Sequence, residues 1–259
     1  MEIKKLLLCL LLFLFVSCVT IAKIPYEKDA SIIGMTVWLD KFPFSMYPTS
    51  VFFVKVNDNE NFLNGNEIIK TNYSYGERVY LLNPKPGKYY AVAAYEKTTN
   101  QSGKVTMTDY TNYYFPVKLI ELTEANIKNN EAVYLGHYTV DVPFRWSYSG
   151  INKPDEAQFY YCKKLQPNKL EWTAEGCCLE GCMAFISRKR ESALAVNIKE
   201  IKKDLKSESI FWEKTRLCFA GNSNTSYDKE SIEANKGWIE LIDRKIQQLK
   251  SKEKNIELK

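Results

Sequence analysis

One histidine and seven cysteines are the residues of this 259-residue chain with the most specific chemistry. A serine or cysteine nucleophile activated by an imidazole would have to use His137, because the chain has no other histidine. Alternation along the run from Val133 places His137 on the same strand face as Leu135. We therefore interpret His137 as a structural histidine and expect no catalytic residue and no enzymatic activity.

Other catalytic and metal-binding signatures are missing from the sequence. It contains no phosphate-binding loop, no dinucleotide fingerprint and no C-x₂-C knuckle; the nearest spacing is Cys178-x₃-Cys182. The acidic residues Asp109, Glu121 and Asp141 form no recognisable constellation. An envelope hydrolase with a carboxylate pair stays open as an alternative. We expect neither a cofactor nor a metal.

Five cysteines follow residue 150, and an exported protein would hold them in an oxidising compartment. Two disulfides and one spare thiol are then expected. We expect Cys162 to pair with Cys177 or Cys178, and Cys218 to pair with Cys182 or with the remaining neighbour. Closing a loop of about 15 residues would stabilise the fold by about 3 kcal/mol. The alternatives are a metal site and a functional thiol.

The N-terminal segment has the order of an export signal. Two lysines precede an apolar run, residues 6–16, and the small Ser17 precedes Cys18. The run has about 11 residues, fewer than the roughly 20 that cross a bilayer as a helix. We therefore expect residues 1–17 to be a removed signal peptide, and residues 18–30 to be a tether that begins at a lipid-attachment cysteine.

The four residues that end this segment, Phe15 to Cys18, resemble the lipobox of bacterial lipoproteins. Phe15 departs from the usual Leu, Val or Ile and is similar to looser spirochaetal usage. The resemblance implies palmitate or a similar acyl chain on Cys18, and a lipid-anchored protein at the bacterial outer membrane. Each buried CH₂ group of such a chain contributes about 0.8 kcal/mol. The alternative is simple secretion after a cut at Ala22.

Charge and composition exclude some partners. The chain is 45% hydrophobic, enough for a packed core, and its net charge of +5 is too mild to indicate nucleic acid. Arg188, Lys189 and Arg190 make a short basic stretch that could contact anionic lipid headgroups or acidic polysaccharide. A solvated helix face is the alternative interpretation of that stretch.

Residues 31–147 alternate in the manner of short strands between turns, which predicts an antiparallel β-sandwich. Residues 88–96 are apolar on both faces and predict a central strand covered on both sides. The tyrosine-rich segment Tyr110 to Phe115 is either a recognition surface or a buried strand. The expected strands are residues 35–39, 51–56, 78–82, 88–96, 113–120 and 132–142.

Residues 148–259 differ in character, because they contain the five cysteines and helical periodicity. Apolar residues recur at spacings of three and four over residues 194–205 and again over residues 239–249. We therefore expect a disulfide-stapled α+β extension with two amphipathic helices, the second at the C-terminus. The whole chain is expected to have a β-rich α+β fold.

A family resemblance rests on the segment Asn83 to Tyr90, NPKPGKYY, in which a Pro-Gly turn leads into an aromatic strand. This segment resembles the small transthyretin-like and carboxypeptidase-regulatory-like sandwiches of bacterial surface proteins. The run from Val133 to His137, after Leu119 to Thr123, is similar to closing strands of envelope lipoproteins. The resemblance spans residues 31–145 and implies a structural or binding role without catalytic residues.

These observations predict a non-enzymatic, membrane-anchored envelope lipoprotein with a binding or structural role. Its expected partners are a membrane, through the N-terminal lipid, and a protein or an envelope polymer. The alternatives are the hydrolase with a carboxylate pair and a scaffold subunit of an envelope complex. A scaffold would require a contiguous exposed apolar patch.

Overall fold

The computed structural model consists of two compact units. Lys28–Glu208 form the strand unit, and Met1–Glu27 with Ser209–Lys259 form the helix unit. The side chains of residues 168–174, 188–190 and 194–195 are not described. The described residues are 24–257, apart from 42, 44, 58–59, 66, 103–104, 143–153, 166–167, 175–187, 191–193 and 221–231.

Five strands form sheet A of the strand unit. Neighbouring strands are antiparallel except β1 and β9, which run parallel to each other. The expected purely antiparallel arrangement is therefore wrong at this pair, and sheet A is mixed. The order across the sheet is β13 (Asn197–Lys202), β9 (Ala132–Val142), β1 (Ile32–Lys41), β5 (Arg78–Leu82) and β4 (Tyr73–Tyr75).

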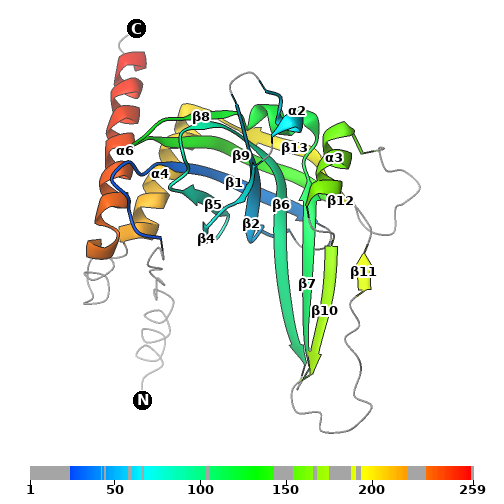
Figure 1. Cartoon of the computed structure of the whole chain (residues 1–259). Helices are drawn as coiled ribbons and strands as arrows, with labels where there is room; N and C mark the ends of the chain where they lie inside the picture. The colour runs from blue at the N-terminus through cyan, green and yellow to red at the C-terminus, as the bar shows by residue number, and fades with distance from the viewer. Residues whose placement is uncertain are drawn as a thin grey trace, which may run out of the picture. The chain divides into compact units, whose positions relative to one another are not determined.

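Eight strands form sheet B, with β6 at its centre between β2 and β7. Residues 89–94 of β6 are at most 5% exposed, which confirms the predicted central strand. Strands β6, β7 and β10 extend together beyond the other strands of the sheet (Figure 1). The order is β11 (Arg188–Arg190), β10 (Asn168–Ala174), β7 (Val105–Tyr114), β6 (Gly87–Ser102), β2 (Ser50–Val56) and β3 (Glu67–Lys70), with β12 (Leu194–Ala195) on β7 and β8 (Ala125–Ile127) on β6.

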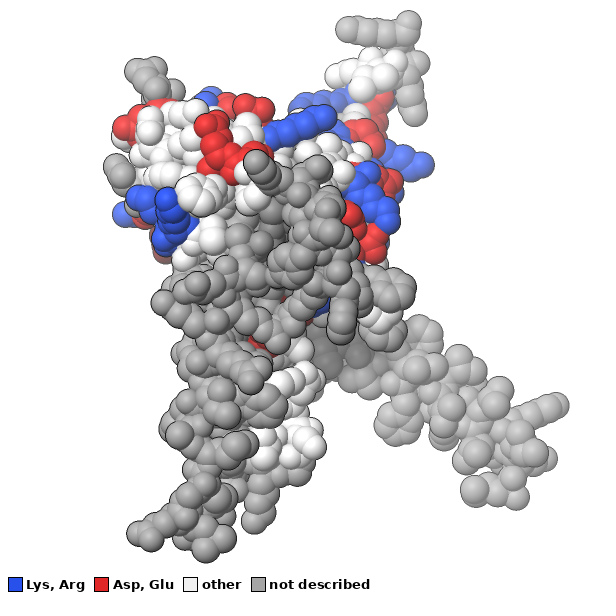
Figure 2. Space-filling model, turned by 90° about the vertical axis from the view of Figure 1, so that its right-hand side faces the viewer, with Lys and Arg blue, Asp and Glu red and all other residues white. Residues whose placement is uncertain are grey.

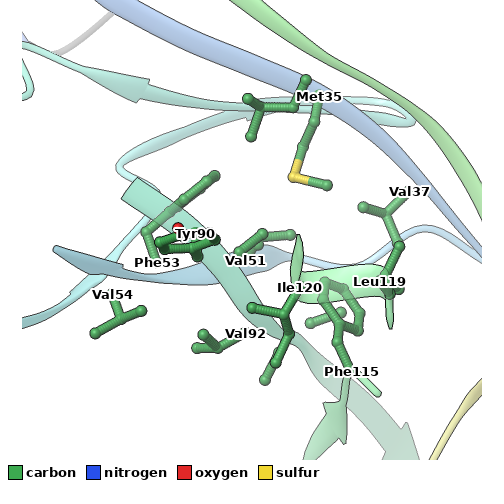
Figure 3. Packing of buried hydrophobic residues seen from close by; sticks show 14 of the residues in the cluster. Met35, Val37, Val51, Phe53, Val54, Tyr90, Val92, Phe115, Leu119 and Ile120 are labelled. Atoms are coloured by element: carbon green, nitrogen blue, oxygen red, sulfur yellow. The ribbon is translucent and has the colours of Figure 1, made fainter. Parts of the chain in front are cut away.

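The two sheets share one apolar core. Met35 and Val37 of β1 face Val51 of β2 and Val92 of β6, and Leu119 of helix α2 packs among them (Figure 3). All five are completely buried. Burying side chains of this size stabilises the fold by about 1.5–3 kcal/mol each. The core thus fixes the positions of β6 and its neighbouring strands.

The predicted turn between β5 and β6 is confirmed in its backbone. Asn83 has φ 55° and Gly87 has φ 143°, a region that favours glycine because it lacks a Cβ atom. The Tyr89 hydroxyl donates to the carbonyl oxygen of Lys85 at 2.6 Å. The turn therefore sets the start of the central strand.

The helix expected over residues 194–205 is instead strands β12 and β13. Strand β13 pairs with β9, and a bulge between Ile198 and Glu200 lets Ile198 and Ile201 pair with Val140 and Tyr138. Those two partners lie two residues apart on β9 and therefore share one face. A spacing of three residues, which is typical of a helix, here arises from a bulged strand.

The expected strand over residues 113–120 ends at Tyr114. Helix α2 (Val117–Leu122) follows, with Pro116 as its N-cap residue at φ −69°. Proline has no N–H for a sheet ladder, and its fixed φ suits the start of a helix. Two further short elements belong to the strand unit: the 3₁₀ helix η1 (Phe62–Asn64) and helix α3 (Glu156–Lys164).

Both sheets recruit strands from beyond residue 147, where we expected a separate extension. Strands β10, β11 and β12 belong to sheet B, and β13 belongs to sheet A. The strand unit continues to Glu208. The expected boundary therefore falls between residues that share the same sheets.

The helix unit contains most of α4 (Leu205–Ala220) and all of α6 (Lys236–Glu257), which confirms the predicted C-terminal helix. The N-terminal segment packs on the start of α6. Trp238 Nε1 donates to the carbonyl oxygen of Ile24 at 3.1 Å, and the rings of Tyr26 and Trp238 meet edge to face at 5.2 Å. At least residues 24–26 of the expected tether are thus held against a helix.

No helix in the described ranges of the chain combines the length and the apolar character that crossing a bilayer requires.

Candidate binding surface on sheet B

Strand alternation separates neighbouring residues of β6 onto opposite faces of sheet B. Glu96 points toward the core and is 6% exposed, whereas Tyr95 and Lys97 point outward. Strand β7 contributes Tyr113 to the inner face, and Tyr110 pairs with Lys97 on the outer face. Two polar clusters therefore lie back to back on the same stretch of sheet.

The inner cluster, which we call the ion-pair cluster, consists of Lys41, Glu96, Thr98 and Tyr113. Lys41 Nζ lies 3.6 Å from Glu96 Oε2, and the Tyr113 hydroxyl donates to that same oxygen. Thr98 Oγ1 donates to Glu96 Oε1 at 2.6 Å, and Lys41 Nζ donates to the Tyr113 hydroxyl at 3.3 Å. Because Lys41 belongs to β1, the cluster ties sheet A to sheet B.

Burial, followed by the neighbouring Glu96 carboxylate, raises the pKa of Tyr113 far above its usual value. The phenol therefore keeps its proton and serves as a permanent donor to Glu96. A buried carboxylate with its hydrogen bonds satisfied fixes the local geometry of β6 and β7. The ion-pair cluster thus acts as a structural support for the outer face.

The outer cluster, which we call the aromatic–lysine row, consists of Phe52 (β2), Lys70 (β3), Tyr95 and Lys97 (β6) and Tyr110 (β7). The ring centroid of Tyr95 lies 6.0 Å from that of Phe52 and 6.4 Å from that of Tyr110. Lys70 Nζ lies 3.4 Å from the Tyr95 centroid, and Lys97 Nζ lies 5.7 Å from the Tyr110 centroid. These are cation–π distances.

The two lysines of the row are exposed, and the three rings are partly exposed. Burial, followed by repulsion from Lys97, lowers the pKa of Lys70. Among the described side chains, no carboxylate forms an ion pair with either Lys70 or Lys97. The row therefore presents flat apolar rings beside positive charge that the described residues do not neutralise.

Backbone register continues the row toward the predicted basic stretch. Tyr110 pairs with Lys169 on β10, and Lys169 pairs with Lys189 on β11. The stretch Arg188–Arg190 is thus a strand at the edge of sheet B, two strands from Tyr110, and not the helix face of the alternative interpretation. The structure brings this predicted contact stretch into the same sheet as the aromatic–lysine row.

The tyrosine-rich segment divides between the two alternatives that the sequence left open. Tyr113, Tyr114 and Phe115 are at most 1% exposed, so this part of the segment is buried strand and its continuation. Tyr110, by contrast, belongs to the partly exposed row. The remaining members of the row were not singled out from the sequence, although the period-two spacing of Tyr95 and Lys97 was a usable signal.

His137 lies on β9, but a bulge changes the face it was expected to occupy. Between the pairs Gly34–Tyr134 and Thr36–His137, β9 advances one residue more than β1. His137 is half-buried, and its Nε2 atom lies 3.4 Å from Thr139 Oγ1. Burial lowers the pKa of His137. It therefore packs as a neutral side chain of the sheet.

Cys162 on α3 carries a free thiol, and Cys218 lies buried on α4. The Cys162 side chain contacts that of Tyr114, and burial together with this neighbour raises the pKa of Tyr114 to about 12. The expected partners Cys177, Cys178 and Cys182, like the lipidation candidate Cys18, lie outside the described residues.

The three acidic residues considered for hydrolysis lie on different elements. Asp109 is on β7, Glu121 is on α2 and Asp141 is on β9. Within the described part of the chain, no three His, Cys, Asp or Glu side chains gather closely enough to hold a metal ion.

The helix unit carries a shallow groove of about 500 Å³ between α4 and α6. Leu217, which is 59% exposed, and Ile246 line it, but Arg216 Nε and Asp243 Oδ1 also pair within it at 2.6 Å. Charged side chains thus interrupt its apolar surface. The groove is not the contiguous apolar patch that the scaffold alternative requires.

Comparisons with known proteins identify no family. No family model matches the chain, and no curated protein matches it. One solved structure, a proposed carbohydrate-binding protein from Pseudomonas aeruginosa, is 10% identical over 44% of this chain and 91% of that chain, with a TM-score of 0.22. Another, a minor pilin from Streptococcus agalactiae, is 10% identical over 52% of this chain and 50% of that chain, also at 0.22. Similarity at this level carries no argument about fold or function.

Proposed function

We propose that this chain is a non-enzymatic protein of the bacterial cell envelope, anchored through acyl chains on Cys18, that binds an extended polymer on the aromatic–lysine row. The observation that carries the binding role is the continuity of the row. Phe52, Tyr95 and Tyr110 lie on three adjacent strands, with successive ring centroids 6.0 and 6.4 Å apart. An elongated ligand can contact such rings in succession.

The chemistry of the row supports binding over catalysis. Aromatic rings and ammonium groups hold and orient a ligand, whereas covalent catalysis needs a nucleophile beside a base. The buried carboxylate of this region, Glu96, faces the core on the opposite side of the sheet. The Glu96 carboxylate accepts hydrogen bonds from the Tyr113 and Thr98 hydroxyls, which supports a structural role for it.

The binding role is tested by affinity electrophoresis of the full chain in native gels that contain either dextran or polygalacturonate. We expect at least one polymer to retard the wild-type chain, and the Tyr95→Leu/Tyr110→Leu double variant to lose most of that retardation. Leucine preserves apolar bulk but removes the flat ring face.

The matched control is Phe159→Leu, which removes an aromatic ring that is 56% exposed on α3 and is not a member of the row. This variant should migrate as the wild type does. If neither polymer retards the wild type, or if the double variant is retarded as strongly as the control, the binding role is wrong.

The anchoring role is tested with Cys18→Ala, which removes the proposed acylation site. We expect the variant to leave the membrane fraction and the wild type to carry the added mass of acyl chains, because those chains supply the proposed membrane affinity. Cys9→Ala, in the expected signal peptide, is the matched control and should remain bound. Membrane partitioning of Cys18→Ala equal to that of the control would contradict anchoring at this residue.

A further inference from the structure

The aromatic–lysine row combines two recognition chemistries. Lys70 and Lys97 stand on one face without a carboxylate partner among the described side chains, and each lies over an aromatic ring. Bringing two ammonium groups together on a partly buried surface costs free energy, which an anionic ligand would recover. The charges of the row therefore favour a ligand with repeated negative groups.

Backbone register places Lys97 and Tyr110 in one line with positions 169 and 189, so that the line crosses β6, β7, β10 and β11. Strands in a sheet are about 4.8 Å apart, so this line is roughly 14 Å long. A line of this length suits an extended chain better than it suits a single small anion.

Uncharged members of the same face add hydroxyl groups beside the rings. Thr99 and Thr108 pair across β6 and β7, with their Oγ1 atoms 3.3 Å apart, and both share the outer face with Tyr110. A pyranose ring has an apolar C–H face that stacks on an aromatic ring, and hydroxyl groups at its rim that exchange hydrogen bonds. A polypeptide polyanion has no comparable flat face.

We propose that the polymer bound on the row is an acidic polysaccharide. Its pyranose rings stack on Phe52, Tyr95 and Tyr110, and its anionic groups pair with Lys70 and Lys97. This inference rests on the proposed polymer-binding function and names the ligand class for that same surface.

Single-stranded nucleic acid is the competing ligand for a surface of rings and cations. Domains that bind nucleic acid usually carry a strongly basic charge, whereas the whole chain has a net charge of only +5. The described part of the surface drawn in Figure 2 carries both positive and negative side chains. The mild net charge therefore favours the polysaccharide.

The test measures equilibrium binding of the full chain to four probes: polygalacturonate, dextran, poly-L-glutamate and oligo-dT. Polygalacturonate offers both rings and charge, dextran offers rings alone, and poly-L-glutamate offers charge alone. We expect polygalacturonate to bind most tightly, by about tenfold or more over each of the others. Raising the salt from about 0.01 M to about 0.15 M, which shortens the screening length, should weaken this binding.

Two sets of variants separate the contributions. Lys70→Gln/Lys97→Gln should weaken polygalacturonate binding by about tenfold and leave dextran binding unchanged. Tyr95→Leu/Tyr110→Leu should weaken both. Lys85→Gln, at an exposed turn position away from the row, is the matched charge control and should bind polygalacturonate as the wild type does.

The outcomes distinguish this inference from the proposed function. If dextran binds as tightly as polygalacturonate, the polymer-binding role stands and the acidic ligand is wrong. Equal or tighter binding of poly-L-glutamate or oligo-dT also overturns the polysaccharide. If none of the four probes binds, both the ligand class and the polymer-binding role fail.

Discussion

At the scale of single residues, Glu96 connects the two faces of sheet B. Its carboxylate accepts hydrogen bonds from Tyr113 and Thr98 on the core side. Its chain neighbours Tyr95 and Lys97 belong to the aromatic–lysine row on the other side. A change at this buried position should therefore affect both stability and the geometry of the proposed binding surface.

We expect Glu96→Leu to lower the free energy of unfolding by about 1–3 kcal/mol, because the Tyr113 and Thr98 hydroxyls lose their acceptor. Glu96→Gln keeps an acceptor oxygen and should cost less. Urea denaturation measures both changes. Glu121→Leu, at an exposed position on α2, is the control and should stay within about 0.5 kcal/mol of the wild type. A Glu96→Leu chain as stable as this control would show that the cluster has no supporting role.

We expect His137 to make the free energy of unfolding depend on pH below about pH 6.5. Burial holds its folded-state pKa below the ordinary value of 6.5. Below pH 6.5 the unfolded chain therefore binds a proton that the folded chain does not, and stability falls as the pH drops toward the lowered pKa. His137→Gln should remove this part of the loss. Urea unfolding of both chains between about pH 7 and pH 5 measures it. Parallel stability curves would contradict the prediction.

At the scale of elements, sequence pattern predicted most strands of the core and the C-terminal helix, because each has a continuous apolar period. It failed over residues 194–205, where the bulge in β13 gives Ile198 and Ile201 a helix-like spacing. The pattern also extended a strand past Pro116 into α2. Local periodicity cannot reveal a bulge, since the extra residue is accommodated only against the partner strand.

The aromatic–lysine row could not be predicted from the sequence, and the reason is related. Its members come from four strands, and they become neighbours only through the register of β3, β2, β6 and β7. Register depends on which strands pair, which a single sequence does not state. The basic stretch Arg188–Arg190 was visible as a charge run, but its position at the edge of sheet B was not.

Close packing of Tyr26 on helix α6 should protect the N-terminal segment from proteolysis. A Cβ atom on Gly237 would lie 2.3 Å from Tyr26 Cγ and 2.9 Å from Tyr26 Cβ, closer than real contacts allow. Gly237→Ala should therefore displace Tyr26, although alanine is favoured over glycine within a helix by about 1 kcal/mol. We expect chymotrypsin to cleave after Tyr26 faster in this variant.

Glu240→Ala is the matched control for that experiment, since Glu240 is an exposed residue of the same helix. Its cleavage rate after Tyr26 should equal that of the wild type. Equal rates for all three chains would mean that the contact between Tyr26 and α6 does not protect this peptide bond.

At the scale of the whole molecule, the free thiol of Cys162 limits the number of disulfides. Cys162 belongs to the strand unit, and with its thiol free the other four cysteines beyond residue 150 can form at most two disulfides. We expect alkylation of the denatured, unreduced chain to label Cys162 in peptide mass spectra. Recovery of Cys162 in a disulfide would contradict this prediction.

The hydrogen bond from Trp238 to Ile24 limits the length of free chain between the proposed acylated Cys18 and the helix unit. Six residue steps separate Cys18 from Ile24, a length that reaches at most about 21 Å when fully drawn out. Helix α6, with 22 residues, is about 33 Å long. An acylated Cys18 would thus keep the start of α6 within this reach of the lipid headgroups, so the helix unit would lie close to the bilayer surface.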